Sequence, residues 1–185
     1  MMLSMEPWNA AVEALLEAED HSALVRFSQH APSRTLRYLS ARLYNEDPQI
    51  KWRAVRALGA LAADPSLLTE QRLAEQLRRY FWFLNDESGA VPFGVPEAIG
   101  EILARRPSLQ PAFLPLICSM THQEDVNQTG AIERGVIWAI GRLGADALRG
   151  GADIVQIRDL AAAHPDPETR RVAAWTLSRL EAARV

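Results

Sequence analysis

Tryptophan and arginine recur at matching positions in three of four similarly patterned segments of the chain. In each segment we count from one small residue (Gly59, Gly100, Gly141 or Ser178) to positions −7, −3 and +1, which are spaced i, i+4, i+8. These positions, which we call the stripe, are Trp52, Arg56 and Ala60; Phe93, Glu97 and Glu101; Arg134, Trp138 and Arg142; and Arg171, Trp175 and Arg179. Exposed aromatic side chains flanked by Arg are typical of binding hot spots, and guanidinium groups stack on indoles and pair with carboxylates. The stripe predicts a surface that binds an acidic or aromatic-bearing peptide.

The same residues also have a purely structural interpretation, which the sequence leaves open. Arg56 stands in register with Glu97, and Glu101 with Arg142, so these charges would pair between neighbouring segments. The tryptophan rings would then fill gaps between stacked helices. The choice depends on whether the three tryptophans face solvent or the packed interior.

A polar loop between two of the segments offers further candidates. It runs from Asn85 to Gly94 and contains the candidate site residues Asn85, Asp86, Glu87 and Ser88. Polar loops that contain glycine are common functional positions, so this one is expected at the rim of the surface, within reach of a cation or a hydroxyl group. In the alternative, Asn85 or Ser88 caps the next helix and Gly89 turns the chain. The acidic residues do not have the spacing of a calcium-binding loop.

The chain lacks the residue patterns of common catalytic and metal sites. Its histidines never stand three or four residues apart, and it has no Gly-x-Ser-x-Gly, P-loop or Rossmann motif. The histidines are His21, His30, His122 and His164. The single cysteine, Cys118, excludes a disulfide framework and stands among apolar residues, which predicts a buried, unreactive thiol. We therefore expect no metal, no cofactor and no catalytic residue.

Helices must position the stripe, and the apolar pattern provides them. Around each small residue, apolar side chains occupy positions −5, −4, −1 and +2, which form one helix face. The small residues follow one another after 41, 41 and 37 residues, as in two-helix solenoid repeats. Glycine weakens a helix, so its recurrence predicts close helix–helix approach. Each of these helices is preceded by another amphipathic stretch, at 33–44, 69–84, 109–120 and 152–163, while 6–18 and 21–30 form an N-terminal pair.

The predicted fold is all-α, an α-α superhelix of about five helix pairs in one domain that spans 1–185. Residues 1–30 are expected to cap its N-terminal end, and the repeats are expected at 31–64, 65–107, 108–148 and 149–185. The dipeptides Asp47-Pro48 and Asp166-Pro167 predict helix N-caps. The segment from Tyr80 to Leu84 is apolar nearly all round and is expected to pack in the core.

Two segments carry a family likeness. Residues 47–59 (DPQIKWRAVRALG) and 166–178 (DPETRRVAAWTLS) resemble the second half of a HEAT-like repeat of the phycobilin-lyase type. Residues 82–102 are similar to a family of short bacterial HEAT-like proteins with no known activity. The likeness covers roughly residues 31–185. It implies a right-handed stack of helix pairs whose second helices line a concave face, where the stripe would lie; it does not define a function, because such arrays serve many roles.

Composition limits the choice of partner. The chain has 185 residues and a net charge of −3, which gives no sequence-wide attraction to nucleic acid or to an anionic membrane. No window is apolar enough for a transmembrane helix, and the first 19 residues lack the basic residues of a secretory leader, so we expect a cytoplasmic protein. The last helix is only half polar, which leaves a monomer and an end-to-end homodimer both open.

Three functional hypotheses follow. The preferred one is a non-catalytic scaffold that binds a segment of a protein partner in its concave groove. The second, implied by the resemblance alone, is a phycobilin lyase-like protein that handles a small molecule. The third is a nucleic-acid-binding HEAT-like protein that uses the Arg and Trp residues of the last two segments, although Glu97 and Glu101 in the same groove disfavour it.

Overall fold

The computed structural model describes residues 5–85, 93–122 and 130–182, and in these ranges the chain is built from α-helices and two short 3₁₀ turns with no strand. The helices are α1 (Met5–Glu17), α2 (His21–Ser28), α3 (Pro32–Arg42), α4 (Pro48–Ala63), α5 (Glu70–Leu84), α6 (Val95–Arg105), α7 (Gln110–Ser119), α8 (Gly130–Leu143), α9 (Ala145–Arg149), α10 (Ile154–Ala163) and α11 (Pro167–Ala182). The all-α prediction is confirmed. The short helix α9 was not predicted, because five residues are too few to show a period.

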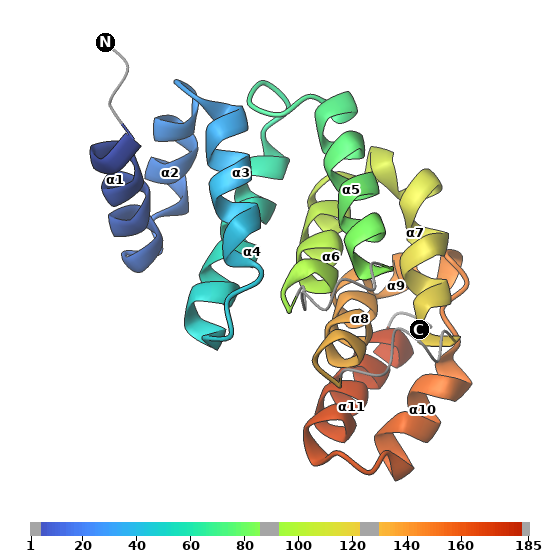
Figure 1. Ribbon diagram of the computed structural model, residues 1–185. Coiled ribbons are helices and arrows are strands. Elements are labelled where there is room, and N and C mark those ends of the chain that lie inside the picture. The colour runs from blue at the N-terminus through green and yellow to red at the C-terminus, as the bar shows by residue number, and fades with distance from the viewer. Residues whose placement is uncertain (1–4, 86–92, 123–129, 183–185) are drawn as a thin grey trace.

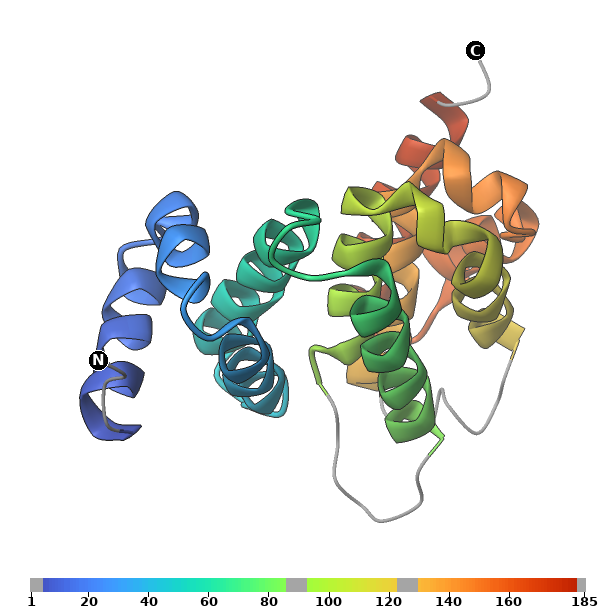
Figure 2. The same ribbon diagram turned by 90° about the horizontal axis from the view of Figure 1, so that it is seen from above.

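The helices stack as successive pairs in two layers that form a solenoid superhelix (Figure 1). The second helices α4, α6, α8 and α11 each pack against the next, and α2 packs against α4. The first helices α1, α3, α5, α7 and α10 form the other layer, and seen from above the pairs follow one another along the array (Figure 2). The second helices lie on the inside of the curve, so any side chain that they turn outward enters a concave surface.

Glycine lets neighbouring second helices approach closely, as the recurrent small residues predict. A Cβ atom on Gly100 of α6 would lie 2.8 Å from both Cα and Cβ of Ala139 in α8. A Cβ atom on Gly141 of α8 would lie 3.0 Å from Cα of Thr176 in α11. Gly59 of α4 differs, because a Cβ there would first meet the side chain of Glu101, 2.9 Å from its Oε2.

The Asp-Pro dipeptides cap the helices that follow them, as the sequence predicts. Asp47 caps α4 by accepting a hydrogen bond from the backbone N–H of Gln49 at 2.8 Å, and Asp166 accepts one from the N–H of Glu168 at 3.2 Å. Asn85 caps the end of α5, not the start of the following helix, because its Nδ2 donates to the carbonyl oxygen of Phe81 at 2.7 Å. The prediction that Asn85 caps the next helix is therefore wrong.

The core is one continuous cluster of mainly aliphatic side chains between the two layers, and it includes the buried residues Leu36, Leu58 and Ile99. The expectation of core packing for the Tyr80–Leu84 segment holds for only part of it. Tyr80 is buried, whereas Trp82 is 63% exposed on the outer layer. Five consecutive helical residues span all directions around the axis, so at least one of them faces away from the core. Among the described residues, no helix has both the length and the apolar character needed to cross a membrane.

Candidate functional site

Three tryptophans form a ladder across the inner face of the array. The rings of Trp52 (α4) and Trp138 (α8) meet edge to face with centroids 4.8 Å apart, and the rings of Trp138 and Trp175 (α11) stack at 6.0 Å and 12°. Trp52 and Trp138 are half-buried, and Trp175 is 39% exposed. The ladder therefore has one face on the packed helices and one in solvent, which lies between the two alternatives that the sequence leaves open.

The ladder passes over α6. Helix α6 lies between α4 and α8 and packs against both, yet Trp52 and Trp138 touch each other. Side chains of alternate helices can meet in this way only where the surface curves inward. The contact thus places the ladder on the concave side of the superhelix (Figure 1).

Glu97 of α6 lies beneath this ladder and is almost fully buried. Its side chain is 4% exposed, and its Oε1 accepts a hydrogen bond from Nζ of Lys51 at 3.1 Å. Its Oε2 has no hydrogen-bond partner and lies against Gly135 of α8, where a Cβ atom would come within 2.6 Å of it. Burial raises the pKa of the Glu97 carboxyl, and the Lys51 ammonium offsets only part of this rise. The expected pairing of Glu97 with Arg56 is wrong, because Lys51 pairs with Glu97 and Arg56 pairs with Glu19.

Glu101, one turn further along α6, pairs as predicted. Nε of Arg142 donates to its Oε1 at 2.7 Å, and Nη2 of Arg142 to its Oε2 at 3.3 Å, which is a two-pronged guanidinium–carboxylate contact. The Glu101 side chain is only 12% exposed. The two carboxylates of α6 are therefore largely buried between α4 and α8.

The arginines stay nearer the solvent. Nη1 of Arg134 pairs with Oδ2 of Asp166 at 2.7 Å, and Nη1 of Arg56 pairs with Oε2 of Glu19 at 2.9 Å. Arg171 pairs with Glu168 on its own helix, and Arg179 is exposed. Ala60, the remaining stripe position of α4, is half-buried.

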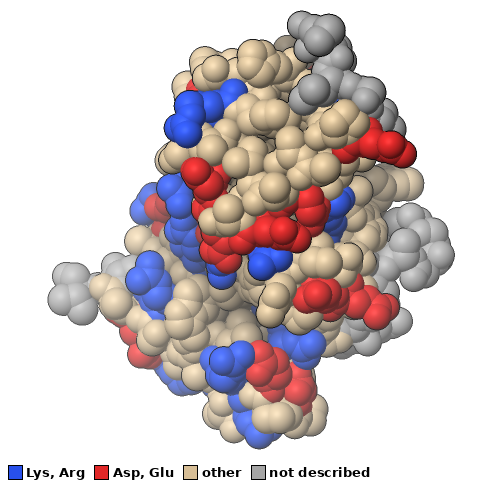
Figure 3. Space-filling model, turned by 90° about the vertical axis from the view of Figure 1, so that its left-hand side faces the viewer, with Lys and Arg blue, Asp and Glu red and all other residues tan. Residues whose placement is uncertain are grey.

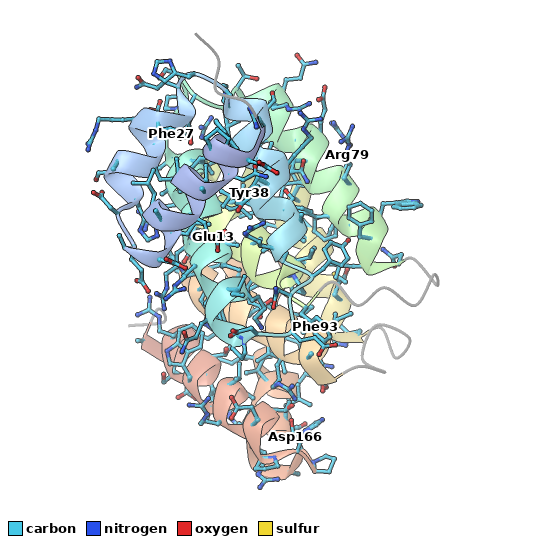
Figure 4. All side chains as sticks on the ribbon, turned by 60° about the vertical axis from the view of Figure 1, so that its left-hand side comes forward. Glu13, Phe27, Tyr38, Arg79, Phe93 and Asp166 are labelled. Atoms are coloured by element: carbon cyan, nitrogen blue, oxygen red, sulfur yellow. The ribbon has the colours of Figure 1, made fainter. Side chains whose placement is uncertain are left out.

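Asp166 lies in the turn between α10 and α11 (Figure 4), and it connects this turn to α8 through Arg134. Its Oδ2 accepts hydrogen bonds from Oγ1 of Thr169 at 2.8 Å and from Arg134. These bonds, with those from the backbone at the start of α11, lower the pKa of Asp166 to about 2. Asp166 is therefore ionised at any ordinary pH, both as the N-cap of α11 and as the partner of Arg134.

Two predicted site elements are not part of the helices that carry the ladder. Phe93 precedes the N-cap of α6, Gly94, so it is not part of the helix whose phase placed it in the stripe (Figure 4). Of the loop candidates, Asn85 is engaged in capping α5. Asp86, Glu87 and Ser88 lie outside the described residues.

Three charged residues contribute to the site without having been predicted. Lys51 and Arg53 flank Trp52 on α4, and Glu19 lies in the turn between α1 and α2. Lys51 is the single lysine of the chain, which could have marked it. Glu19 carries no sequence signal, because the contact with Arg56 spans 37 residues and depends on how the N-terminal pair docks.

The charges on this side of the molecule are mixed. Acidic and basic side chains lie interspersed on the face shown in Figure 3, with no single-sign field. In the part of the chain that the structure describes, no group of three His, Cys, Asp or Glu side chains could hold a metal ion. Cys118 is buried, as predicted, and burial raises the pKa of its thiol to about 11.

Comparison with known proteins identifies the architecture alone. No protein-family profile matches the chain, and no curated protein matches it. Among solved structures it is similar to the designed armadillo repeat protein YIII(Dq.V1)4CPAF in complex with the peptide (KR)4, with a TM-score of 0.55 and 18% identity over 97% of this chain and 77% of that one. It is also similar to the designed armadillo repeat protein YIII(Dq)4CqI, with a TM-score of 0.52 and 19% identity over 97% and 78% of the two chains. The chain is thus a helical-repeat solenoid of armadillo-like architecture.

Proposed function

We propose that this protein is a non-catalytic scaffold that binds an extended segment of a protein partner along its concave face. The observation that carries the proposal is the ladder of Trp52, Trp138 and Trp175, which leaves indole surface open to solvent beside arginine side chains. Indole and guanidinium groups dominate binding energy in protein interfaces because they combine large area with directional contacts. Solenoid folds use their concave surfaces in this way.

The partner segment is acidic and carries aromatic or aliphatic side chains. The side chains of Glu97 and Glu101 in α6 are only 4% and 12% exposed, whereas the side chain of Arg56 is 50% exposed. The exposed charges of the stripe itself are therefore guanidinium groups. The acids that pair with them, Glu19, Asp166 and Glu168, are between 36% and 49% exposed, so an incoming carboxylate can exchange with them. One structural neighbour holds the basic peptide (KR)4; likeness to that neighbour supports the capacity of the fold to hold a peptide, while the charges here favour the opposite sign.

The repeat type that we propose remains the HEAT-like, phycobilin-lyase one, and its support is the pair of Asp-Pro segments at 47–59 and 166–178. No observation on the described residues favours small-molecule chemistry or nucleic-acid binding. The interspersed charges of Figure 3 lack the continuous basic path that a phosphate backbone requires.

Fluorescence anisotropy with labelled peptides tests the proposal. The probe is a peptide of alternating glutamate and tyrosine, and the variants are Trp175→Ala on the ladder and Trp82→Ala on the outer layer, both of which remove an exposed indole. We expect Trp175→Ala to weaken binding by about 5- to 30-fold, as for an interface hot spot, and Trp82→Ala to leave it unchanged. Absence of binding to the wild type, or equal losses in the two variants, would refute the proposal. The same assay with a labelled oligonucleotide tests the nucleic-acid alternative, and we expect no binding of the oligonucleotide.

A further inference from the structure

An open pocket of about 430 Å³ lies at the N-terminal end of the concave face, next to the ladder. It is formed by the start of α4 and by the turn between α1 and α2. Its lining residues are Glu19, Pro48, Gln49, Trp52, Arg53 and Arg56. An aromatic wall and two guanidinium groups are therefore gathered in an open hollow that is large enough to admit an amino-acid side chain.

The pocket already holds a carboxylate, and it comes from the chain itself. Oε2 of Glu19 accepts a hydrogen bond from Nη1 of Arg56 at 2.9 Å. Both side chains are about half exposed, at 48% and 50%, so the pair is open to solvent and to exchange. Arg53 lines the same pocket, and its charge is one of those that lower the pKa of Glu13, while no hydrogen bond from Arg53 is found among the described residues. One guanidinium is thus engaged by an exchangeable partner, and a second stands beside it.

The backbone at Glu19 is unusual. Its φ angle is +51°, and within the described ranges it is the one residue other than glycine with a positive φ. It closes α1, with its N–H donating to the carbonyl oxygen of Leu16 at 3.1 Å, a position that glycine normally takes because a Cβ atom is unfavourable there. The turn itself gains nothing from a glutamate. What the side chain adds is a carboxylate on Arg56.

We propose that this pocket is the subsite for an acidic side chain of the bound segment, and that Glu19 is its built-in occupant, which the incoming carboxylate displaces. The inference rests on the proposed peptide-binding function and names the chemistry of one position in it. The occupant shows which group the pocket accepts, a carboxylate on Arg56. An incoming Asp or Glu would reach Arg53 as well and could place its β- or γ-methylene group on the Trp52 ring.

If the incoming carboxylate must displace Glu19, removal of the Glu19 charge should strengthen peptide binding. Glu19→Gln keeps the Cβ atom and the positive φ but removes the charge, whereas Glu19→Gly removes both the charge and the backbone strain. Both variants free Arg56, so both should bind the glutamate–tyrosine peptide more tightly, by about two- to fivefold, which is the scale of an exposed ion pair. The gain should shrink in high salt. Glu19→Gly should melt no lower than the wild type, since glycine suits this turn.

The matched control uses the peptide instead of the protein. A peptide of alternating glutamine and tyrosine should bind more weakly than the glutamate peptide, and Arg53→Gln/Arg56→Gln should abolish this difference. If the variants at Glu19 and at the two arginines leave the glutamate preference unchanged while Trp175→Ala weakens both peptides, the subsite is refuted and the proposed function stands. If neither peptide binds the wild type, both proposals fail. Displacement of the glutamate peptide by millimolar inorganic phosphate would overturn the assignment to an acidic side chain.

Discussion

The contact between Gly100 and Ala139 sets how closely α6 and α8 approach, and Gly100→Ala tests it. The added methyl carbon would lie 2.8 Å from Cα and Cβ of Ala139, whereas carbon atoms in contact are normally about 3.5–4.0 Å apart. The obstacle is a second helix backbone, which cannot rotate aside, so the helices must separate by the better part of an ångström. Alanine gains about 1 kcal/mol in helix propensity over glycine, but overpacking of a rigid contact costs about 3 kcal/mol. The net loss is about 2 kcal/mol.

Gly59→Ala is the matched control, because Gly59 stands 41 residues earlier at the same position in its helix. There the new methyl group would first meet Oε2 of Glu101, the end of a flexible side chain. The propensity gain and the cost of moving the carboxylate should nearly cancel, so the free energy of unfolding should change by less than about 1 kcal/mol.

Urea denaturation followed by circular dichroism measures both variants. At the midpoint of thermal unfolding, a loss of about 2 kcal/mol corresponds to a fall in Tm of about 4–8 °C for a chain of this length. Separation of α6 from α8 should also move Trp138 away from Trp52, which near-ultraviolet circular dichroism reports through the coupled indole bands. If Gly100→Ala were as stable as the wild type and kept this signal, the close approach of the two helices would not be what the glycine provides.

Three further predictions concern titrating groups. Burial raises the pKa of Glu97, so the folded chain retains a proton there that the unfolded chain releases; stability should fall as the pH rises from the ordinary carboxyl value through the raised one, and urea midpoints of Glu97→Gln should lack this fall. Hydrogen bonds hold the pKa of Asp166 at about 2, so its stabilisation should be complete above about pH 4 and disappear as the pH falls toward 2, a loss that acid titration of Asp166→Asn should not show. Burial raises the pKa of Cys118 to about 11, so an aromatic disulfide reagent at pH 8 should label the folded protein slowly and the urea-unfolded protein at once; rapid labelling of the folded state would contradict its burial.

The fold was accessible from sequence because each helix repeats one local rule. An apolar face of period 3.6 and a small residue at a constant phase, with an Asp-Pro start at α4 and α11, are all properties of a single segment. The predicted second helices match α4, α6, α8 and α11. The exceptions are local as well: α9 is too short for a period, and α6 starts at Val95, after Phe93, so the helical phase could not be extended back to that ring.

The site was accessible only where neighbouring helices keep the same register. Trp138 and Trp175 occupy position −3 in successive helices and stack, and Glu101 and Arg142 occupy position +1 and pair. Trp52 occupies position −7 and meets Trp138 one turn out of register, because a third helix lies between them. Contacts that skip a helix depend on the curvature of the array, which no single repeat encodes.

Helix α6 shows how a repeat that departs from its neighbours shapes the whole surface. It carries Glu97 and Glu101 where α8 carries Trp138 and Arg142. Two glutamates on a flat helix face would cancel the charge of the surrounding arginines. Here the curvature closes the ladder over α6, and Gly59 and Gly135 receive the carboxylates, so both acids are withdrawn from solvent.

The consequence is a concave face whose accessible charge differs from its composition. The acids of α6 are neutralised by Lys51 and Arg142 below the surface, while arginines of α4 and α11 and the open faces of the indoles remain above it. The stripe of a chain with a net charge of −3 therefore exposes guanidinium groups and indoles, and the acids that pair with these arginines come from outside the stripe. This is the reason for proposing an acidic segment as the partner: the acids of α6 are buried, whereas the arginines of the stripe can exchange their partners for an incoming carboxylate.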